Sequence, residues 1–169
     1  MKKLLWLLLL TTAACAQNDS AIAKARAACG PVNVKFDVKE QNTDGSVKDP
    51  EQGKELIYII GEDSTCKTNC GFLARIGMNG SWVGAIRGNS QLSFTVEPGE
   101  QHLCANWQTV LVPPGRYTSL AKINVEPGKT YYFRVALVLY AGLDLELIDS
   151  DEGKYLVAVS QNAVFKPKQ

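Results

Sequence analysis

A strong excess of charge of either sign is missing from this chain of 169 residues. Its 18 lysine and arginine residues balance 17 aspartate and glutamate residues, which gives a formal net charge of +1. Proteins that bind the phosphates of nucleic acids usually carry a basic excess. We therefore expect no nucleic acid as a partner.

The motifs of common catalytic and nucleotide-binding sites are missing as well. The sequence holds no phosphate loop, no dinucleotide-binding glycine fingerprint and no Gly-x-Ser-x-Gly nucleophile motif. His102 is the only histidine, so a catalytic triad would have to use it as general base. We expect no enzyme activity, no catalytic residue and no cofactor, and a hydrolase built on His102 is the least favoured alternative.

The N-terminal apolar run, residues 4–10, is too short to span a bilayer, which takes about 20 residues. It follows Lys2 and Lys3 and precedes a series of small residues at 11–16. This layout is typical of a secretory signal peptide. We predict a signal peptide over residues 1–16 and an exported protein, placed in the periplasm or cell envelope or outside the cell.

Two processing routes are open at the end of this segment. Ala14 and Ala16 satisfy the small-residue rule for cleavage before Gln17. Alternatively, Cys15 is the lipid-modified cysteine of a bacterial lipoprotein, which would tether the domain to a membrane face. Thr12 stands where such proteins usually carry a large apolar residue, so we favour soluble release. Membrane contact is expected only through a lipid on Cys15.

Four cysteines follow the predicted signal peptide: Cys29, Cys66, Cys70 and Cys104. An even number in an exported chain favours two disulfides. Of the three possible pairings we lean to Cys66 with Cys70 and Cys29 with Cys104. A zinc site made of Cys66, Cys70, His102 and Cys104 is less favoured, because this spacing fits no standard zinc motif. We expect no metal.

Most of the chain after residue 31 has the patterns of β-strands. Residues 32–39 alternate strictly between apolar and polar, which predicts a strand with one apolar face. Leu56–Ile60 is apolar at both odd and even positions, which predicts a central strand covered on both faces. Further strands are predicted at 72–78, 81–87, 92–96, 102–108, 117–125, 130–140 and 143–147. Asn79-Gly80 predicts a type I′ hairpin turn between the first two of these.

Two short helices and one loop complete the prediction. Residues 20–28 are good helix formers between a capping segment and Gly30-Pro31. Residues 41–53 are polar and rich in turn formers, which indicates an exposed linker. Capping residues at 149–152 favour a helix over 154–160, with a final strand as the alternative and a calcium loop less favoured. The expected divisions are the signal peptide 1–16, an N-terminal segment 17–53 and a sandwich domain 54–169.

The order of these elements resembles a bacterial family, the domain of unknown function 2846. The segments that carry the resemblance are Leu56–Ile59, Gly80–Gly84, Val96–Leu103 and Val125–Val135. Because these are turn-and-strand motifs, they specify a scaffold better than a chemistry. The resemblance implies an exported or lipid-anchored all-β domain without an assigned activity.

We predict an all-β sandwich of immunoglobulin-like or transthyretin-like layout with a short helix near each end. The expected function is non-catalytic: binding to, or structural association with, another envelope protein. The alternative is a small-ligand module that binds sugar or lipid through Trp82, Trp107 and Tyr132. A sheet edge or apolar patch left open by the fold would favour a protein partner.

Overall fold

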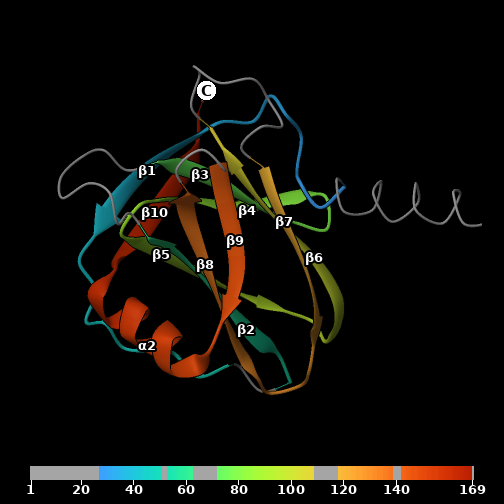
Figure 1. Cartoon of the computed structure of the whole chain (residues 1–169), viewed down its shortest axis with the longest axis vertical. Helices are drawn as coiled ribbons and strands as arrows, with labels where there is room; N and C mark the ends of the chain where they lie inside the picture. Colours follow the sequence, from blue (N-terminus) through green and yellow to red (C-terminus); the bar gives the residue numbers. More distant parts are fainter. Residues whose placement is uncertain (1–26, 51–52, 63–71, 109–117, 139–141, 169) are drawn as a thin grey trace, which may run out of the picture.

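The structure is a computed structural model that describes residues 27–50, 53–62, 72–108, 118–138 and 142–168. Within these ranges the strands are β1 (Phe36–Gln41), β2 (Glu55–Glu62), β3 (Leu73–Met78), β4 (Ser81–Arg87), β5 (Ser90–Val96), β6 (Gly99–Trp107), β7 (Thr118–Val125), β8 (Thr130–Val138), β9 (Gly142–Ile148) and β10 (Gln161–Pro167), and the helix is α2 (Ser150–Val159). They form a six-stranded sheet of order β1-β10-β5-β2-β8-β9 and a four-stranded sheet of order β4-β3-β6-β7 (Figure 1). The predicted all-β fold with two packed sheets is confirmed.

β2 lies in the middle of the six-stranded sheet and is buried on both faces. Ile57 and Ile59 point toward the four-stranded sheet and form the main core with Phe133 of β8. Tyr58 and Ile60 point the other way and pack beneath α2. Each fully buried isoleucine contributes about 1.5–3 kcal/mol to stability. The predicted central strand with two covered faces is confirmed.

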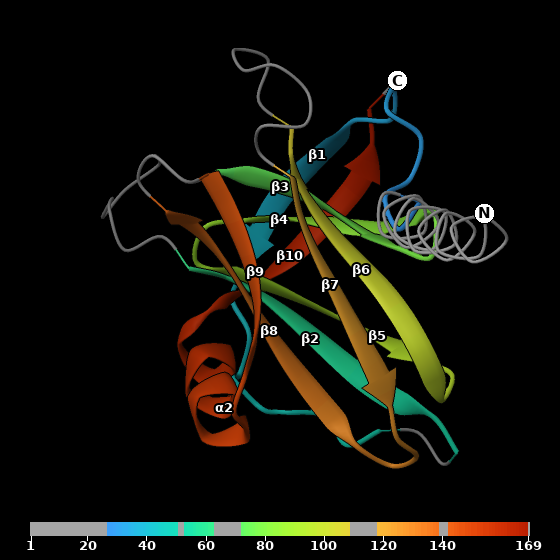
Figure 2. The ribbon, with the colours of Figure 1, turned by 45° about the vertical axis from the view of Figure 1, so that its right-hand side comes forward.

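The two sheets meet along both of their sides. On one side the Leu145 amide of β9 donates a hydrogen bond to the Ser119 hydroxyl of β7 at 3.1 Å. On the other side, Leu92 of β5 and Phe165 of β10 lie over Gly84 of β4, and a Cβ at Gly84 would meet both side chains within 3 Å. In Figure 2, β1 and β10 cross the ribbon of β4, with which both are in contact.

The β3–β4 hairpin has the predicted turn. Asn79 and Gly80 have φ angles of 49° and 89°, the two positive values that a type I′ turn requires. Asn and Gly tolerate this conformation better than other residues because their steric cost is low there.

Helix α2 begins at a capped residue, as predicted, although it starts four residues earlier than expected. Asp149 Oδ1 accepts hydrogen bonds from the amides of Asp151 and Glu152 at 2.9 Å and 3.0 Å. These bonds, that from Glu152 first, lower the pKa of the Asp149 carboxyl. The helix packs on Tyr132 so closely that a Cβ at Gly153 would overlap the tyrosine ring. Capping therefore begins the helix, and a glycine allows it to lie on the sheet.

The substitution Gly153→Ala tests this close approach. In an exposed helix the change would stabilise by about 1 kcal/mol through helix propensity. Here the added methyl group pushes α2 off Tyr132, so we expect a net loss of about 1–3 kcal/mol in unfolding free energy. Urea unfolding followed by circular dichroism measures it, with Lys154→Ala on the exposed face as control. A variant as stable as the parent would show that α2 does not pack this tightly.

The first predicted strand is wrong over its N-terminal half. The strand begins at Phe36 rather than at residue 32, and the side chain of Val32 is 81% exposed. The Gln108 amide bonds both backbone groups of Phe36, accepting from its N–H at 2.6 Å and donating to its carbonyl at 2.8 Å. Strand pairing with β10 starts at Phe36. The carbonyls of Val32 and Val34 bond the side chain of Arg75 instead of a neighbouring strand.

Two other differences concern the ends of the chain. The predicted helix at 20–28 falls outside the described residues except for Ala27 and Ala28, which lie in a turn. A final strand was considered only over 154–160, as the alternative to the helix, whereas β10 begins at Gln161 and pairs antiparallel with β1 and parallel with β5. Its side chains are mostly exposed, so its sequence shows no apolar alternation.

Candidate functional site

Residues 27–35, which we call the strap, cross the outer face of the four-stranded sheet. Cys29 in the strap is joined to Cys104 on β6 by a disulfide, with a Cα–Cα distance of 5.2 Å. The Gly80 amide also donates to the Ala28 carbonyl at 3.1 Å. The predicted Cys29–Cys104 pairing is confirmed, and Cys66 and Cys70 lie outside the described residues. Because the Cys104 sulfur is in a disulfide, it is not available as a thiolate for the zinc alternative.

Arg75 on β3 holds the strap from below. Its Nη1 donates to the carbonyls of Val32 and Val34 at 2.9 Å and 2.5 Å, and its Nε donates to Asn106 Oδ1 at 3.1 Å. Burial lowers the pKa of the guanidinium group. Since backbone carbonyls of the strap satisfy this buried charge, the strap is bound to the fold by polar contacts as well as by the disulfide.

The three aromatic residues proposed for ligand binding lie on three different strands. Trp82 on β4 lies against the Arg75 guanidinium, 4.4 Å from Cζ to the ring centroid, and its indole N–H donates to the Pro31 carbonyl at 2.8 Å. Tyr132 is only 3% exposed and stacks on Tyr58 beneath α2, and burial raises the pKa of its hydroxyl. Trp107 packs against the main core at the end of β6. None of the three lines either of the two clefts described below.

His102 lies in a shallow hollow of about 290 Å³ beside the strap. Its Nε2 is 3.0 Å from Glu100 Oε1, and Lys122 Nζ is 3.0 Å from Glu100 Oε2. Hydrogen bonds from Lys122 and then from His102 lower the pKa of the Glu100 carboxyl. The described lining is Ala27, Ala28, Asn79, Glu100 and His102, which offers no hydroxyl or thiol as a nucleophile. The arrangement is an exposed ion-pair cluster.

A second charged cluster ties α2 and β9 to the sheet. Arg134 on β8 lies 2.6 Å from Glu146, 2.7 Å from Glu152 and 3.5 Å from Glu62, measured between nitrogen and oxygen atoms. The hydrogen bond to Glu146 is the main cause of the raised pKa of Arg134. These three carboxylates are thus already paired with Arg134.

The feature that could bind a partner is an open edge on the six-stranded sheet. β5 pairs with β2 along its length, from Gln91 opposite Ile60 to Val96 opposite Glu55. On its other side it pairs with β10 at two positions only, Ser90 and Gln91, and β10 then continues beside β1. Residues 92–96 therefore have a described strand on one side and none on the other.

The backbone groups at this edge can be assigned from the ladder. The Leu56 amide donates to the Lys129 carbonyl at 3.2 Å, so the backbone N–H and C=O groups of Leu56 point toward β8 and away from β5. Antiparallel pairs alternate between hydrogen-bonded and non-hydrogen-bonded. Thr95, opposite Leu56, and Ser93, two residues before it, therefore direct their N–H and C=O groups away from β2. No described residue satisfies these four groups.

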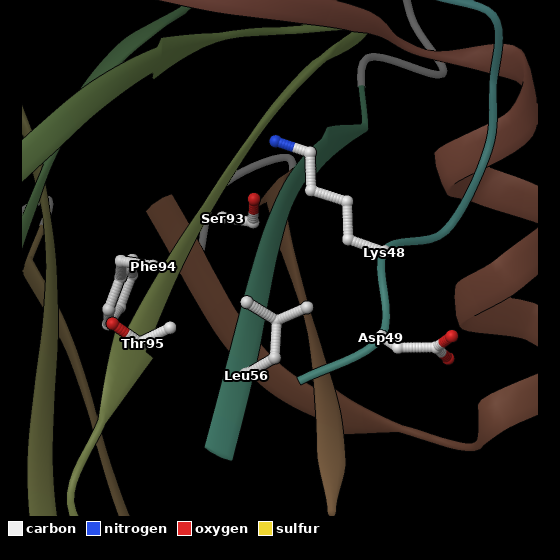
Figure 3. A pocket seen from close by; sticks show the side chains of 6 residues that line it. All are labelled: Lys48, Asp49, Leu56, Ser93, Phe94 and Thr95. Carbon is white, nitrogen blue, oxygen red and sulfur yellow. The ribbon is translucent and has the colours of Figure 1, made fainter. Parts of the chain in front are cut away.

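A cleft of about 380 Å³ lies beside the open edge, on the outer face of the sheet (Figure 3). It is lined by Lys48, Asp49, Leu56, Ser93, Phe94 and Thr95. The Lys48 amide donates to the Tyr58 hydroxyl at 2.8 Å, which holds the loop over the sheet. Figure 3 shows the Lys48 side chain extending across β2 toward β5, with the Asp49 carboxylate turned to the other side.

Sequence reasoning found the strand at 92–96 but missed the site that it forms. The alternation of Leu92, Phe94 and Val96 with polar residues predicts which side chains face the core. Whether a strand lies at an edge depends on its neighbours, and the neighbour here is the unpredicted β10. Lys48 was assigned only to a polar linker, and no local signal places it over β5.

No helix among the described residues is long and apolar enough to cross a bilayer. Comparison with models of known protein families and with curated proteins found no match for this chain.

Proposed function

We propose that this is an exported, non-catalytic protein of the cell envelope that binds an extended segment of a partner protein at the open edge of β5. The single observation that carries the proposal is the unpaired row of backbone groups at Ser93 and Thr95. Exposed donors and acceptors at this spacing are matched by another extended backbone, which adds one strand to the sheet.

The fold itself supports strand addition at this edge. β10 pairs in parallel with β5 at Ser90 and Gln91, so it occupies the first outward-facing position of the row. Ser93 and Thr95 are the next two outward-facing positions, and β10 has left the edge before it reaches them. A partner segment would continue the row where β10 stops. Because the open row is short, we expect the complex to be weak and transient.

The proposed location is supported by the N-terminal pattern and by the disulfide. Residues 1–16 have the layout of a signal peptide, and the Cys29–Cys104 bond suits an oxidising compartment. A lipid at Cys15 would tether the chain through the segment that precedes the strap in sequence. The immunoglobulin-like or transthyretin-like layout and the relation to the domain of unknown function 2846 family stay predictions.

A random octapeptide library displayed on phage tests the proposal. We expect the protein to enrich peptides rich in β-formers, and Thr95→Pro to abolish their binding because proline removes an outward N–H. Thr95→Val keeps that N–H and is the matched control, with binding within about twofold of the parent. Chemical-shift changes on peptide addition should centre on the amides of Ser93 and Thr95.

Two outcomes would overturn strand addition at β5. One is that the library yields no enriched peptide. The other is that the enriched peptides bind the Thr95→Pro variant as well as they bind the parent.

A further inference from the structure

We infer that the segment added to β5 alternates apolar and acidic side chains. This inference rests on the proposed function, since it concerns which sequence the same edge selects. An added strand places successive side chains on opposite faces of the sheet. The two faces of the sheet beside β5 differ in chemistry, so each face selects the alternate side chains of the segment that point to it.

The inner face selects apolar side chains. Phe94 lies opposite Ile57, so it points to the same face as the core residues of β2. It is only partly buried, and it packs against the core at the margin of the sheet. A side chain beside Phe94 on an added strand would extend the apolar core by one position and remove more of Phe94 from water.

The outer face offers hydroxyl groups and a cation. The side chains of Ser93 and Thr95 point to this face, and both residues line the cleft together with Lys48. The Lys48 ammonium group forms no ion pair with any residue that the structure describes, and its side chain extends toward β5 (Figure 3). The Asp49 carboxylate is turned away from it.

A carboxylate on the outer face of the added segment would therefore meet one cation and two hydroxyl donors. Glutamate is long enough to extend from a neighbouring strand toward the middle of the cleft. A lysine at the same position would face the Lys48 ammonium group, which is unfavourable at short distance. The expected preference is for glutamate over glutamine, and for glutamine over lysine.

Three capped heptapeptides test the preference: Thr-Val-Glu-Val-Glu-Val-Thr and its counterparts with glutamine or lysine in place of glutamate. We expect the glutamate peptide to bind about threefold more tightly than the glutamine peptide at low salt, the size of one exposed ion pair. The preference should shrink as salt is added. Binding is measured by fluorescence anisotropy of labelled peptides.

The variant Lys48→Met should make the glutamate and glutamine peptides bind equally. Lys39→Met removes one positive charge from β1, away from the cleft, and should leave the preference unchanged. Equal binding of both peptides to the parent, with binding lost in Thr95→Pro, would overturn the acidic preference and leave the proposed function standing. Peptide binding that survives Thr95→Pro would overturn strand addition itself. Failure of all three peptides to bind, beside an enriched library, would overturn the alternating pattern alone.

Discussion

Replacing both Cys29 and Cys104 by alanine is expected to lower the free energy of unfolding by about 4 kcal/mol. The two cysteines are 75 residues apart in sequence, so the disulfide removes a large closed loop from the freedom of the unfolded chain. Domains are stable by about 5–15 kcal/mol in total, so this is a large part of the whole. Urea unfolding of the oxidised parent and the double variant measures the difference.

The double variant Cys66→Ala and Cys70→Ala is the matched control. These cysteines are separated by three residues in sequence, so a bond between them would close only a short loop and stabilise less. If the Cys29–Cys104 variant were as stable as the parent, the contacts of the strap with Arg75, Trp82 and Gly80 would be sufficient to hold it. The disulfide would then contribute nothing to the fold.

Proline at two adjacent positions of β5 is expected to lower the stability by very different amounts. Phe94→Pro removes an N–H that points to β2 and a side chain that packs on the core, so we expect a loss of about 3 kcal/mol or more. Thr95→Pro removes an N–H that points to the open edge, so we expect a loss below about 1 kcal/mol. Urea unfolding of both variants measures the contrast.

Phe94→Leu is the control for the side chain, because it keeps the backbone N–H and most of the apolar volume. Equal destabilisation by the two prolines would contradict the assignment of the ladder, and with it the open edge. The contrast between the two prolines therefore tests the premise of the proposed function without any ligand. It also shows that the Thr95→Pro variant is folded when its peptide binding is measured.

Local patterns were sufficient for most of the strands. Leu56–Ile60 is apolar at every position except Tyr58, and only a central strand buries both of its faces. Asn79-Gly80 specifies its turn because these residues accept positive φ at low cost. Asp149 specifies the start of α2 because its carboxylate satisfies free amides. In each of these cases the determining interaction lies within a few residues.

Contacts between distant segments decided the rest. Residues 32–35 alternate as a strand would, but the carbonyls of Val32 and Val34 bond Arg75, more than 40 positions away in sequence. The chain there runs as a strap because a buried guanidinium needs acceptors. The apolar residues of β10, Ala163–Phe165, are consecutive, so its pairing with β1 and β5 leaves no alternating pattern in its own sequence.

The sequence by itself determined that this chain forms β-strands, where most of them turn, and which side chains face the core. These properties follow from the period of two and from turn residues, which act locally. Only the tertiary structure decided that β10 leaves β5 after Gln91 and that Lys48 lies over the exposed positions. Whether an edge is open depends on which other strands pair beside it, and a strand's own residues do not carry that information.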